Sequence, residues 1–371
     1  MNLQALSLGL YVHIPFCSNA CAYCHFLKMT PTPERLAIYF KKLEAEIAYW
    51  QTQLPHRHFE TIFWGGGSPS CLSCDALNHL SHLFIHASKP KEWTVEVSPI
   101  NITLEKLNLL KNIGISRISM GVQSFNPNIL KQLGRRQTPQ QVFQAYDNIR
   151  KAGFKNVNLD LIFPPDFSSI EIWKQDLQTA LSLQPEHIST YCLSYENETG
   201  PFSKDHYKYV DETKEATFYE FTWQFLADQG YQHYEVSNFS KPGFECLHNL
   251  NTWRMQEWIG YGPSAASQLK LKRFQNAFNL SDWQPNSHIN IVEFTEFELF
   301  QDCLIFGLRM NEGICLKKLQ QRFPSIDLNK YLPLWEYFCQ KGWIYFEDQH
   351  IRCTSQGLLL ADSLALEILT F

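Results

Sequence analysis

The feature that most constrains this chain is a regular alternation of short apolar runs with segments of helical spacing over its first two thirds. At 36–54, for example, apolar residues recur every three or four positions and predict one apolar stripe on a helix. About six strand–helix repeats predict an α/β fold with a parallel sheet and external helices, either doubly wound or an incomplete barrel. Both arrangements place ligands in the loops after the carboxyl ends of the strands. The expected strands are Leu10–Ile14, Thr61–Trp64, Thr94–Val97, Arg117–Val122, Val157–Phe163 and His187–Leu193, and the further helices are Asp75–His86, Leu104–Ile113, Pro139–Ala152, Ile170–Leu183 and Glu212–Asp228.

The rhythm changes after about residue 235. We therefore predict a barrel domain at 1–235 and a smaller C-terminal α+β domain at 236–371. The end of the chain predicts two helices, a short hairpin and a final helix, which is a winged-helix-like order. DNA binding is a weak interpretation, because the second helix carries few basic residues to face phosphates. The segments are Leu316–Arg322, Leu328–Lys341, Trp343–Phe346, Ile351–Cys353 and the residues after Ser355.

The formal net charge of −5 argues against sequence-independent nucleic-acid binding, which needs a basic surface. No uncharged run approaches the roughly 18–20 residues that span a bilayer, and the N-terminus has no basic signal-peptide region. We expect a cytoplasmic protein. Its 11 cysteines therefore do not predict a disulfide framework. Most fit small buried hydrophobes, and Cys71 with Cys74 fits an incidental pair.

Three cysteines, Cys17, Cys21 and Cys24, lie within eight residues directly after the first expected strand. Such a group can wrap one inorganic centre. A [4Fe-4S] cluster takes one ligand per iron, so three thiolates leave one iron free for a small molecule with an amino and a carboxylate group. Two alternatives stay open: a structural zinc site with His25 as fourth ligand, and three unrelated buried cysteines.

The Cys-x3-Cys-x2-Cys spacing, preceded by Tyr11-Val-His-Ile-Pro-Phe, resembles the radical S-adenosylmethionine superfamily. Over nearly the whole chain it resembles the branch that contains oxygen-independent coproporphyrinogen III oxidases and haem chaperones of the HemW type. The resemblance implies an incomplete (β/α)6 TIM-like barrel, a [4Fe-4S] cluster, S-adenosylmethionine and an electron donor. The implied chemistry is reductive cleavage of the sulfonium to a 5′-deoxyadenosyl radical. Whether this chain turns over S-adenosylmethionine stays open.

The resemblance also assigns contacts to S-adenosylmethionine. The glycine run after the second strand, with Gly66, Gly67 and Ser68, matches the element that contacts the amino-acid end of the cofactor, and Ser68 replaces the usual threonine. Glu96 matches a contact to a ribose hydroxyl. Taken singly, each of these residues has an ordinary structural explanation, and their joint order carries the assignment. The remaining matches are Tyr11, Tyr23, Gln123, Arg135 and Asp160.

Within this branch we predict a chaperone that binds haem as cargo and transfers it to acceptor proteins. Oxidases of the family carry a further cysteine two residues after the third, where this chain has Phe26, and a longer segment before the cluster than the 16 residues here. The alternative is a coproporphyrinogen III oxidase that forms protoporphyrinogen IX. A degenerate scaffold without a cluster is a third reading, which the intact cysteines oppose.

The segment Cys246-Leu-His248-Asn-Leu-Asn-Thr252-Trp resembles the His-Asn-x-x-Tyr-Trp motif associated with haem binding in that branch. A neutral imidazole is a common axial ligand of haem iron, which makes His248 the candidate ligand. Cys246 is either a thiolate ligand or only a neighbour of the site. The alternative is a packed histidine with no ligand. Thr252 and Gln137 depart from the branch pattern, as does the Pro164-Pro165 turn. Peripheral membrane contact and the oligomeric state stay open.

Overall fold

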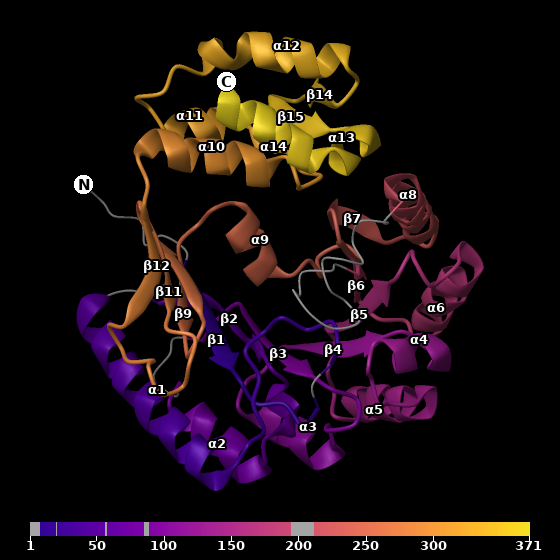
Figure 1. Ribbon diagram of the computed structural model, residues 1–371, viewed down its shortest axis with the longest axis vertical. Helices are drawn as coiled ribbons and strands as arrows, with labels where there is room; N and C mark the ends of the chain where they lie inside the picture. The colour runs from indigo at the N-terminus through magenta and orange to yellow at the C-terminus, as the bar shows by residue number, and fades with distance from the viewer. Residues whose placement is uncertain (1–7, 20, 56–57, 85–88, 194–210) are drawn as a thin grey trace.

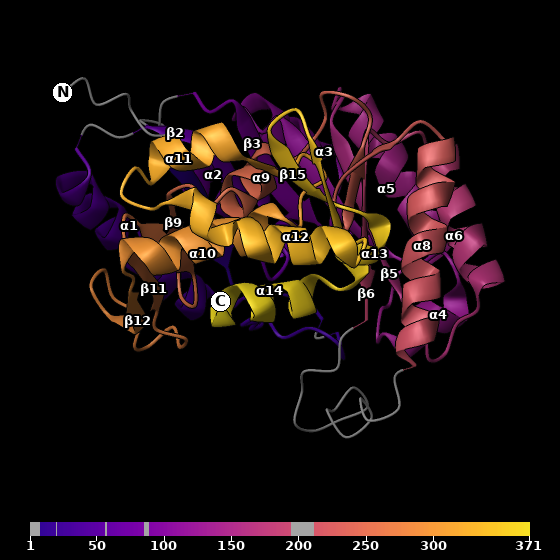
Figure 2. The ribbon, with the colours of Figure 1, turned by 90° about the horizontal axis from the view of Figure 1, so that it is seen from above.

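The computed structural model describes residues 8–371 except 20, 56–57, 85–88 and 194–210. Its centre is a curved sheet with helices along the outer side, and a second layer of helices lies above the sheet (Figure 1). Figure 2, turned by 90°, shows this second layer spread across the sheet. Among the described helices, none is long and apolar enough to cross a membrane.

Six parallel strands lie side by side in the order of the chain, which decides between the two predicted arrangements. A doubly wound sheet reverses its strand order near the middle. In a barrel, each strand lies beside the previous one in chain order, and the right-handed crossovers then place all the helices on one face of the sheet. The prediction of an incomplete barrel is therefore confirmed. The strands are β1 (Leu8–Ile14), β2 (Phe59–Gly66), β3 (Glu92–Val97), β4 (Arg117–Gln123), β5 (Val157–Phe163) and β6 (His187–Cys192), and the outer helices are α1 (Pro33–Gln53), α2 (Cys74–His82), α3 (Leu104–Asn112), α4 (Pro127–Gln132), α5 (Pro139–Lys151), α6 (Ile170–Ser182) and α8 (Glu212–Asp228).

The helices begin where local chemistry favours it. Thr32 caps α1 by accepting a hydrogen bond from the Arg35 backbone N–H, and Pro33 occupies the first turn, where its missing N–H costs nothing. Thr138 and Gln141 form a reciprocal capping box at the start of α5. The expected helix ends agree within one residue for α3, α5 and α6, whereas the end expected at His86 lies outside the described residues.

The sheet continues beyond residue 235 on both sides of the six strands. A further strand, β9, pairs in parallel with β1, and three antiparallel strands extend that edge. The described strands leave β12 and β7 as edges, so the barrel does not close. The domain division at 235 stays a prediction, since the sheet runs through it. The added elements are β7 (Gln232–Glu235), β8 (Asn238–Ser240), α9 (Leu247–Trp253), β9 (Trp258–Tyr261), β10 (Ala266–Leu269), β11 (Lys272–Asn276) and β12 (His288–Glu293). Within the barrel, a short 3-10 helix, η1 (Pro69–Cys71), follows β2.

The C-terminal layer has its own hydrophobic core, which includes Phe300, Trp335 and Phe338. Its elements follow the helix, strand, helix, helix, hairpin order of a winged helix, with a three-stranded sheet of order β13-β15-β14. The sequence predicted this order from Leu316 onward but missed the first helix and first strand. The elements are α10 (Glu296–Gly307), β13 (Ile314–Cys315), α11 (Leu316–Arg322), η2 (Leu328–Tyr331), α12 (Leu332–Gln340), β14 (Ile344–Glu347), β15 (His350–Cys353), α13 (Ser355–Leu359) and α14 (Ala361–Thr370).

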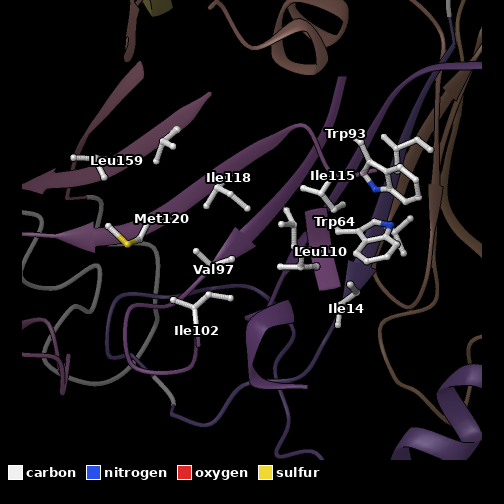
Figure 3. Packing of buried hydrophobic residues seen from close by; sticks show 14 of the residues in the cluster. Ile14, Trp64, Trp93, Val97, Ile102, Leu110, Ile115, Ile118, Met120 and Leu159 are labelled. Atoms are coloured by element: carbon white, nitrogen blue, oxygen red, sulfur yellow. The ribbon is translucent and has the colours of Figure 1, made fainter. Parts of the chain in front are cut away.

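Alternate residues of the central strands point to opposite faces of the sheet. Apolar side chains such as Ile118, Met120 and Leu159 are fully buried and pack in the main core (Figure 3). Burying a side chain of this kind stabilises the fold by about 1.5–3 kcal/mol. The residues between them, such as Ser119 and Asp160, are polar. The concave face of the barrel therefore carries the hydrogen-bonding groups.

Candidate cofactor site at the carboxyl end of the barrel

The three-cysteine loop leaves the end of β1 and is closed at its base. The backbone N–H of Cys17 donates to the Met29 carbonyl at 2.9 Å, and the N–H of Met29 donates to the Pro15 carbonyl at 2.7 Å. These two hydrogen bonds fix both ends of the loop against the barrel. The loop therefore presents its thiols at the carboxyl end of the sheet, where this fold class binds ligands.

The turn between α4 and α5 holds the middle of the loop. The Asn19 side-chain amide donates to the Gly134 carbonyl at 3.0 Å, and the Ala22 N–H donates to the Leu133 carbonyl at 3.4 Å. Gly134 has φ of +70°, and a Cβ there would lie 3.3 Å from the Ala22 nitrogen. Glycine at this position allows the left-handed turn to approach the loop closely.

Two cations lie beside the thiols. Arg135 donates from Nη1 to the Cys21 sulfur at 3.4 Å, and Lys28 donates from Nζ to the Cys24 carbonyl at 2.6 Å. Burial raises the pKa of Cys17 to about 12; Cys71, Cys24 and Cys21 raise it further, whereas Lys28 lowers it. A bound metal centre displaces such thiol protons, and adjacent cations stabilise the thiolates that result.

The donor set fits an iron–sulfur cluster. All three thiols line one cavity together with the cationic side chains of Lys28, Arg135 and Arg136. Within the described part of the chain, no three cysteine, histidine or acidic side chains converge as ligands of a single metal ion. A cubane does not require such convergence, because each thiolate binds its own iron atom.

The cavity has a volume of about 580 Å³ and opens at the carboxyl ends of the strands. The structure brings together there most of the residues that the sequence selected from separate segments. These residues come from the loop after β1, from the ends of β2, β3 and β4, from the middle of β5 and from the turn between α4 and α5. They are Cys17, Cys21, Tyr23, Cys24, Gly66, Gly67, Ser68, Glu96, Gln123, Arg135 and Asp160.

The glycine run packs against the chain itself. A Cβ on Gly67 would lie 2.5 Å from the Phe16 carbonyl oxygen, so only glycine fits between the two loops. The backbone N–H groups of Gly66, Gly67 and Ser68 donate to Glu96, Ile14 and Phe16. Since these donors are already used, the run can offer a ligand carbonyl oxygens and not N–H groups, and the Ser68 carbonyl already accepts from the Cys71 N–H at 2.8 Å. Carbonyl oxygens suit a ligand that carries an amino group.

Two carboxyl groups share the cavity wall. Glu96 accepts a hydrogen bond from Gly66 at 3.1 Å, and Asp160 accepts from Ser119 at 3.1 Å and from Asn158 at 2.8 Å. Burial raises the pKa of Glu96 to about 8, with a further contribution from Asp160, whereas the Gly66 N–H lowers it. Burial likewise raises the pKa of Asp160. The pair offers acceptors to hydroxyl or amino groups of a ligand.

Gln123 ends β4 in a strained backbone. Its φ is +68°, and the β4–β5 register shifts between Gly121 and Gln123. A buried non-glycine residue in this conformation costs about 1–2 kcal/mol, and such strain gathers at functional sites. The bulge turns the Gly121 carbonyl toward Arg135, which donates to it at 2.6 Å, and Gln137 accepts from Arg135 at 2.9 Å. Gln137, noted as a departure from the branch pattern, thus orients the arginine that binds Cys21.

Two predicted residues lie outside the cavity wall. The Tyr11 hydroxyl shares a hydrogen bond with His13 at 3.2 Å, and the Tyr11 ring packs against Phe63. His248 is on α9 at the opposite end of the strands. Its Nδ1 is 2.9 Å from the Thr61 hydroxyl, and its ring centroid is 5.2 Å from that of Phe63. Only 7% of His248 is exposed, and burial lowers its pKa to about 4, with Arg117 adding to the shift.

A buried polar layer closes this amino end of the barrel. The Glu92 carboxylate accepts from the Leu247 and His248 backbone N–H groups, both at 3.1 Å, and so caps α9. His187 bridges Asn158 and Tyr234 through its two ring nitrogens.

The sequence reasoning did not select this layer. The signal was present as polar residues at every second position of otherwise apolar strands, for example Glu92, Thr94 and Glu96 in β3, or Asn158 and Asp160 in β5.

Comparison with known proteins agrees with this geometry. The Radical SAM superfamily profile matches residues 11–174, and the HemN C-terminal domain profile matches residues 297–360. The chain is 31% identical over 363 residues to the haem chaperone HemW of Lactococcus lactis subsp. lactis (strain IL1403), with 95% of each chain covered. It is 36% identical over 267 residues to HemW of Escherichia coli (strain K12), with 70% of this chain and 69% of the relative covered.

A solved structure of coproporphyrinogen III oxidase (HemN) from Escherichia coli matches with a TM-score of 0.82 at 24% identity, over 98% of this chain and 90% of that one, which shows a shared fold. The barrel with a three-thiol loop after its first strand defines a protein of the radical SAM class. The relatives extend over both the barrel and the C-terminal layer. The chain belongs to the haem chaperone HemW family.

Proposed function

We propose that this chain is a haem chaperone, which binds haem and passes it to acceptor proteins and carries an S-adenosylmethionine-dependent iron–sulfur site in its barrel. The observation that carries the proposal is the 31% identity to a haem chaperone over 95% of both chains. Phe26 supports the same choice, because the coproporphyrinogen III oxidases of the branch that this chain resembles have a cysteine at that position.

In this proposal Cys17, Cys21 and Cys24 hold a [4Fe-4S] cluster, which when bound supplies the electron that cleaves the S-adenosylmethionine sulfonium. Arg135 donates to the Cys21 sulfur and offsets negative charge there. Glu96 accepts from a ribose hydroxyl of the cofactor. The remaining proposed cofactor contacts are Tyr23, Gly66, Gly67, Ser68, Gln123 and Asp160. Tyr11 lies outside the cavity wall, where its hydroxyl shares a hydrogen bond with His13.

The cofactor half of the proposal is tested by anaerobic purification. We expect a brown protein with four irons and four sulfides, and replacement of Cys17, Cys21 or Cys24 by alanine should bleach it. Cys339→Ala is the matched control, because this cysteine lies in the C-terminal layer. If the three variants keep a full complement of iron and sulfide, or if the parent holds zinc, the cluster assignment is wrong.

The haem half is tested with haem and an apo-haem protein as acceptor. The haem-loaded chain should transfer haem to the acceptor faster than free haem equilibrates with it, as followed by the Soret spectrum. The alternative function is coproporphyrinogen III oxidation, which the shared HemN fold keeps open. Anaerobic incubation with coproporphyrinogen III, S-adenosylmethionine and a reductant separates the two. Formation of protoporphyrinogen IX would overturn the chaperone proposal.

The proposal includes a cytoplasmic location, an external electron donor for the cluster, and acceptors met in solution or at a membrane surface. His248 remains a candidate axial ligand of haem iron in this proposal, provided that α9 moves. Because His248 is only 7% exposed and hydrogen-bonded to Thr61, α9 has to leave the barrel before haem iron can reach the ring.

A further inference from the structure

A second histidine lies where haem has direct access. His25 follows the last cysteine of the loop, is exposed, and lines the cofactor cavity. Among the described residues, no hydrogen bond or ion pair engages its ring. An unengaged imidazole at a cavity wall has the chemistry of an axial haem ligand.

The other histidines near the barrel lumen lack this access. His248 is held by Thr61 and packed on Phe63, as described above. His13 is 2% exposed, and its Nε2 is 3.2 Å from the Leu27 carbonyl. Ligation through either ring would first break a buried hydrogen bond and move a packed element. His25 requires neither change.

The surroundings of His25 match the remaining chemistry of haem, which is a flat apolar ring with two carboxylates. The adjacent Phe26 is 60% exposed, although large aromatic side chains are usually buried. Ile100, also a cavity-lining residue, is 37% exposed. Arg136 is exposed on the same cavity wall, and a guanidinium binds a carboxylate through two parallel hydrogen bonds.

These residues are separate from the cofactor contacts proposed above. We propose that haem docks at the mouth of the cofactor cavity, with its iron on the His25 imidazole, its ring face against Phe26 and a propionate on Arg136. This inference rests on the proposed haem-carrying function and names the site for it. It also places the cargo next to the iron–sulfur loop, since His25 directly follows Cys24.

The test is an anaerobic titration of the cluster-loaded full chain with ferric haem, read from the Soret band. His25→Ala should raise the Kd by about tenfold or more and remove the histidine-ligand spectrum, and added imidazole should restore that spectrum. Arg136→Gln should raise the Kd by a few fold without moving the band, because it loses a carboxylate partner and no iron ligand. His82→Ala, an exposed histidine of α2, is the matched control and should behave as the parent.

Iron and sulfide analysis of each variant shows whether the neighbouring cluster is intact, so that haem effects are read only from cluster-loaded protein. A His25→Ala variant with the parent Kd and spectrum would overturn the inference. A loss confined to His248→Ala would likewise overturn it and move the ligand to α9. If the parent itself binds no haem, the proposed haem-carrying function fails before the choice of ligand arises.

Discussion

The Glu92 carboxylate offers a direct test of how α9 is held at the closed end of the barrel. Glu92 begins β3, is 5% exposed, and accepts from the Leu247 and His248 N–H groups at 3.1 Å each. In Glu92→Gln, one oxygen remains as a neutral acceptor, and an NH2 group replaces the other. One helical N–H then faces a donor, which leaves it without a partner.

The expected cost follows from these two contacts. Losing a hydrogen bond to a charged group costs about 1.5–3 kcal/mol, and weakening the second to a neutral one adds about 0.5–1.5 kcal/mol. The sum is about 2–4.5 kcal/mol, a large part of the roughly 5–15 kcal/mol that stabilises a domain. Buried Arg117 adds to the loss of stability in this variant. Burial disfavours the charged form of Arg117, and Cys246, Glu92 and other acidic groups offset this and raise its pKa, so removing the Glu92 charge removes part of that stabilisation.

Two measurements check this value. Urea unfolding followed by far-ultraviolet circular dichroism gives the global loss. Hydrogen exchange localises it: the Leu247 and His248 amides should exchange about 30- to 2,000-fold faster if α9 opens locally, at 1.36 kcal/mol per tenfold. Asp147→Asn is the control, since Asp147 belongs to an exposed ion pair with Lys151 and should change stability by no more than about 0.5 kcal/mol. A Glu92→Gln variant within the range of this control would refute the reasoning.

Three further predictions concern carboxyl groups and backbone strain. The affinity for S-adenosylmethionine should rise from pH 7 to pH 9 in the parent, because Glu96 ionises with a pKa of about 8 and the ionised form is the better acceptor; calorimetry on Glu96→Gln should give a flat profile. Gln123→Gly should leave the free energy of unfolding unchanged or raise it by up to about 1 kcal/mol, by relieving the positive φ, while calorimetry shows weaker S-adenosylmethionine binding. Burial raises the pKa of Glu46 to about 8, against an ordinary value of 4.5, so the folded state binds more protons than the unfolded state between these limits. The free energy of unfolding of the parent therefore falls as pH rises through about 8. Urea unfolding of Glu46→Gln should show a smaller fall over the same range.

Contrary results would be specific. An unchanged pH profile in Glu96→Gln would remove that carboxyl from cofactor binding. A destabilised Gln123→Gly would mean that the side chain supports the fold more than the strain costs. Equal pH slopes for the parent and Glu46→Gln would mean that the carboxyl, which accepts from Gly262 at 2.7 Å and Asn276 at 2.7 Å, does not take up a proton on folding.

Much of the barrel was predictable because its information is local. Apolar periodicity, capping residues and turn glycines act over a few neighbouring positions, and they predicted the six parallel strands and most of the outer helices. The cluster loop was predictable for the same reason, since three thiols within eight residues form one group in any fold. The short strands β7 to β12 were not predictable, because three to six residues carry too little pattern and their pairing partners lie far away in the sequence.

The sequence by itself determined the alternation of strands and helices, the trio of thiols, and the set of polar residues at strand ends. Only the tertiary structure decided which of them meet. It placed Glu96, Asp160 and Arg135 around one cavity, and it sent His248 to the opposite end of the strands, where Glu92 and Thr61 hold it. The reason is physical: a side chain's face follows from local periodicity, but its neighbours follow from strand order and from which helix fills the barrel, and both of these depend on packing across the whole chain.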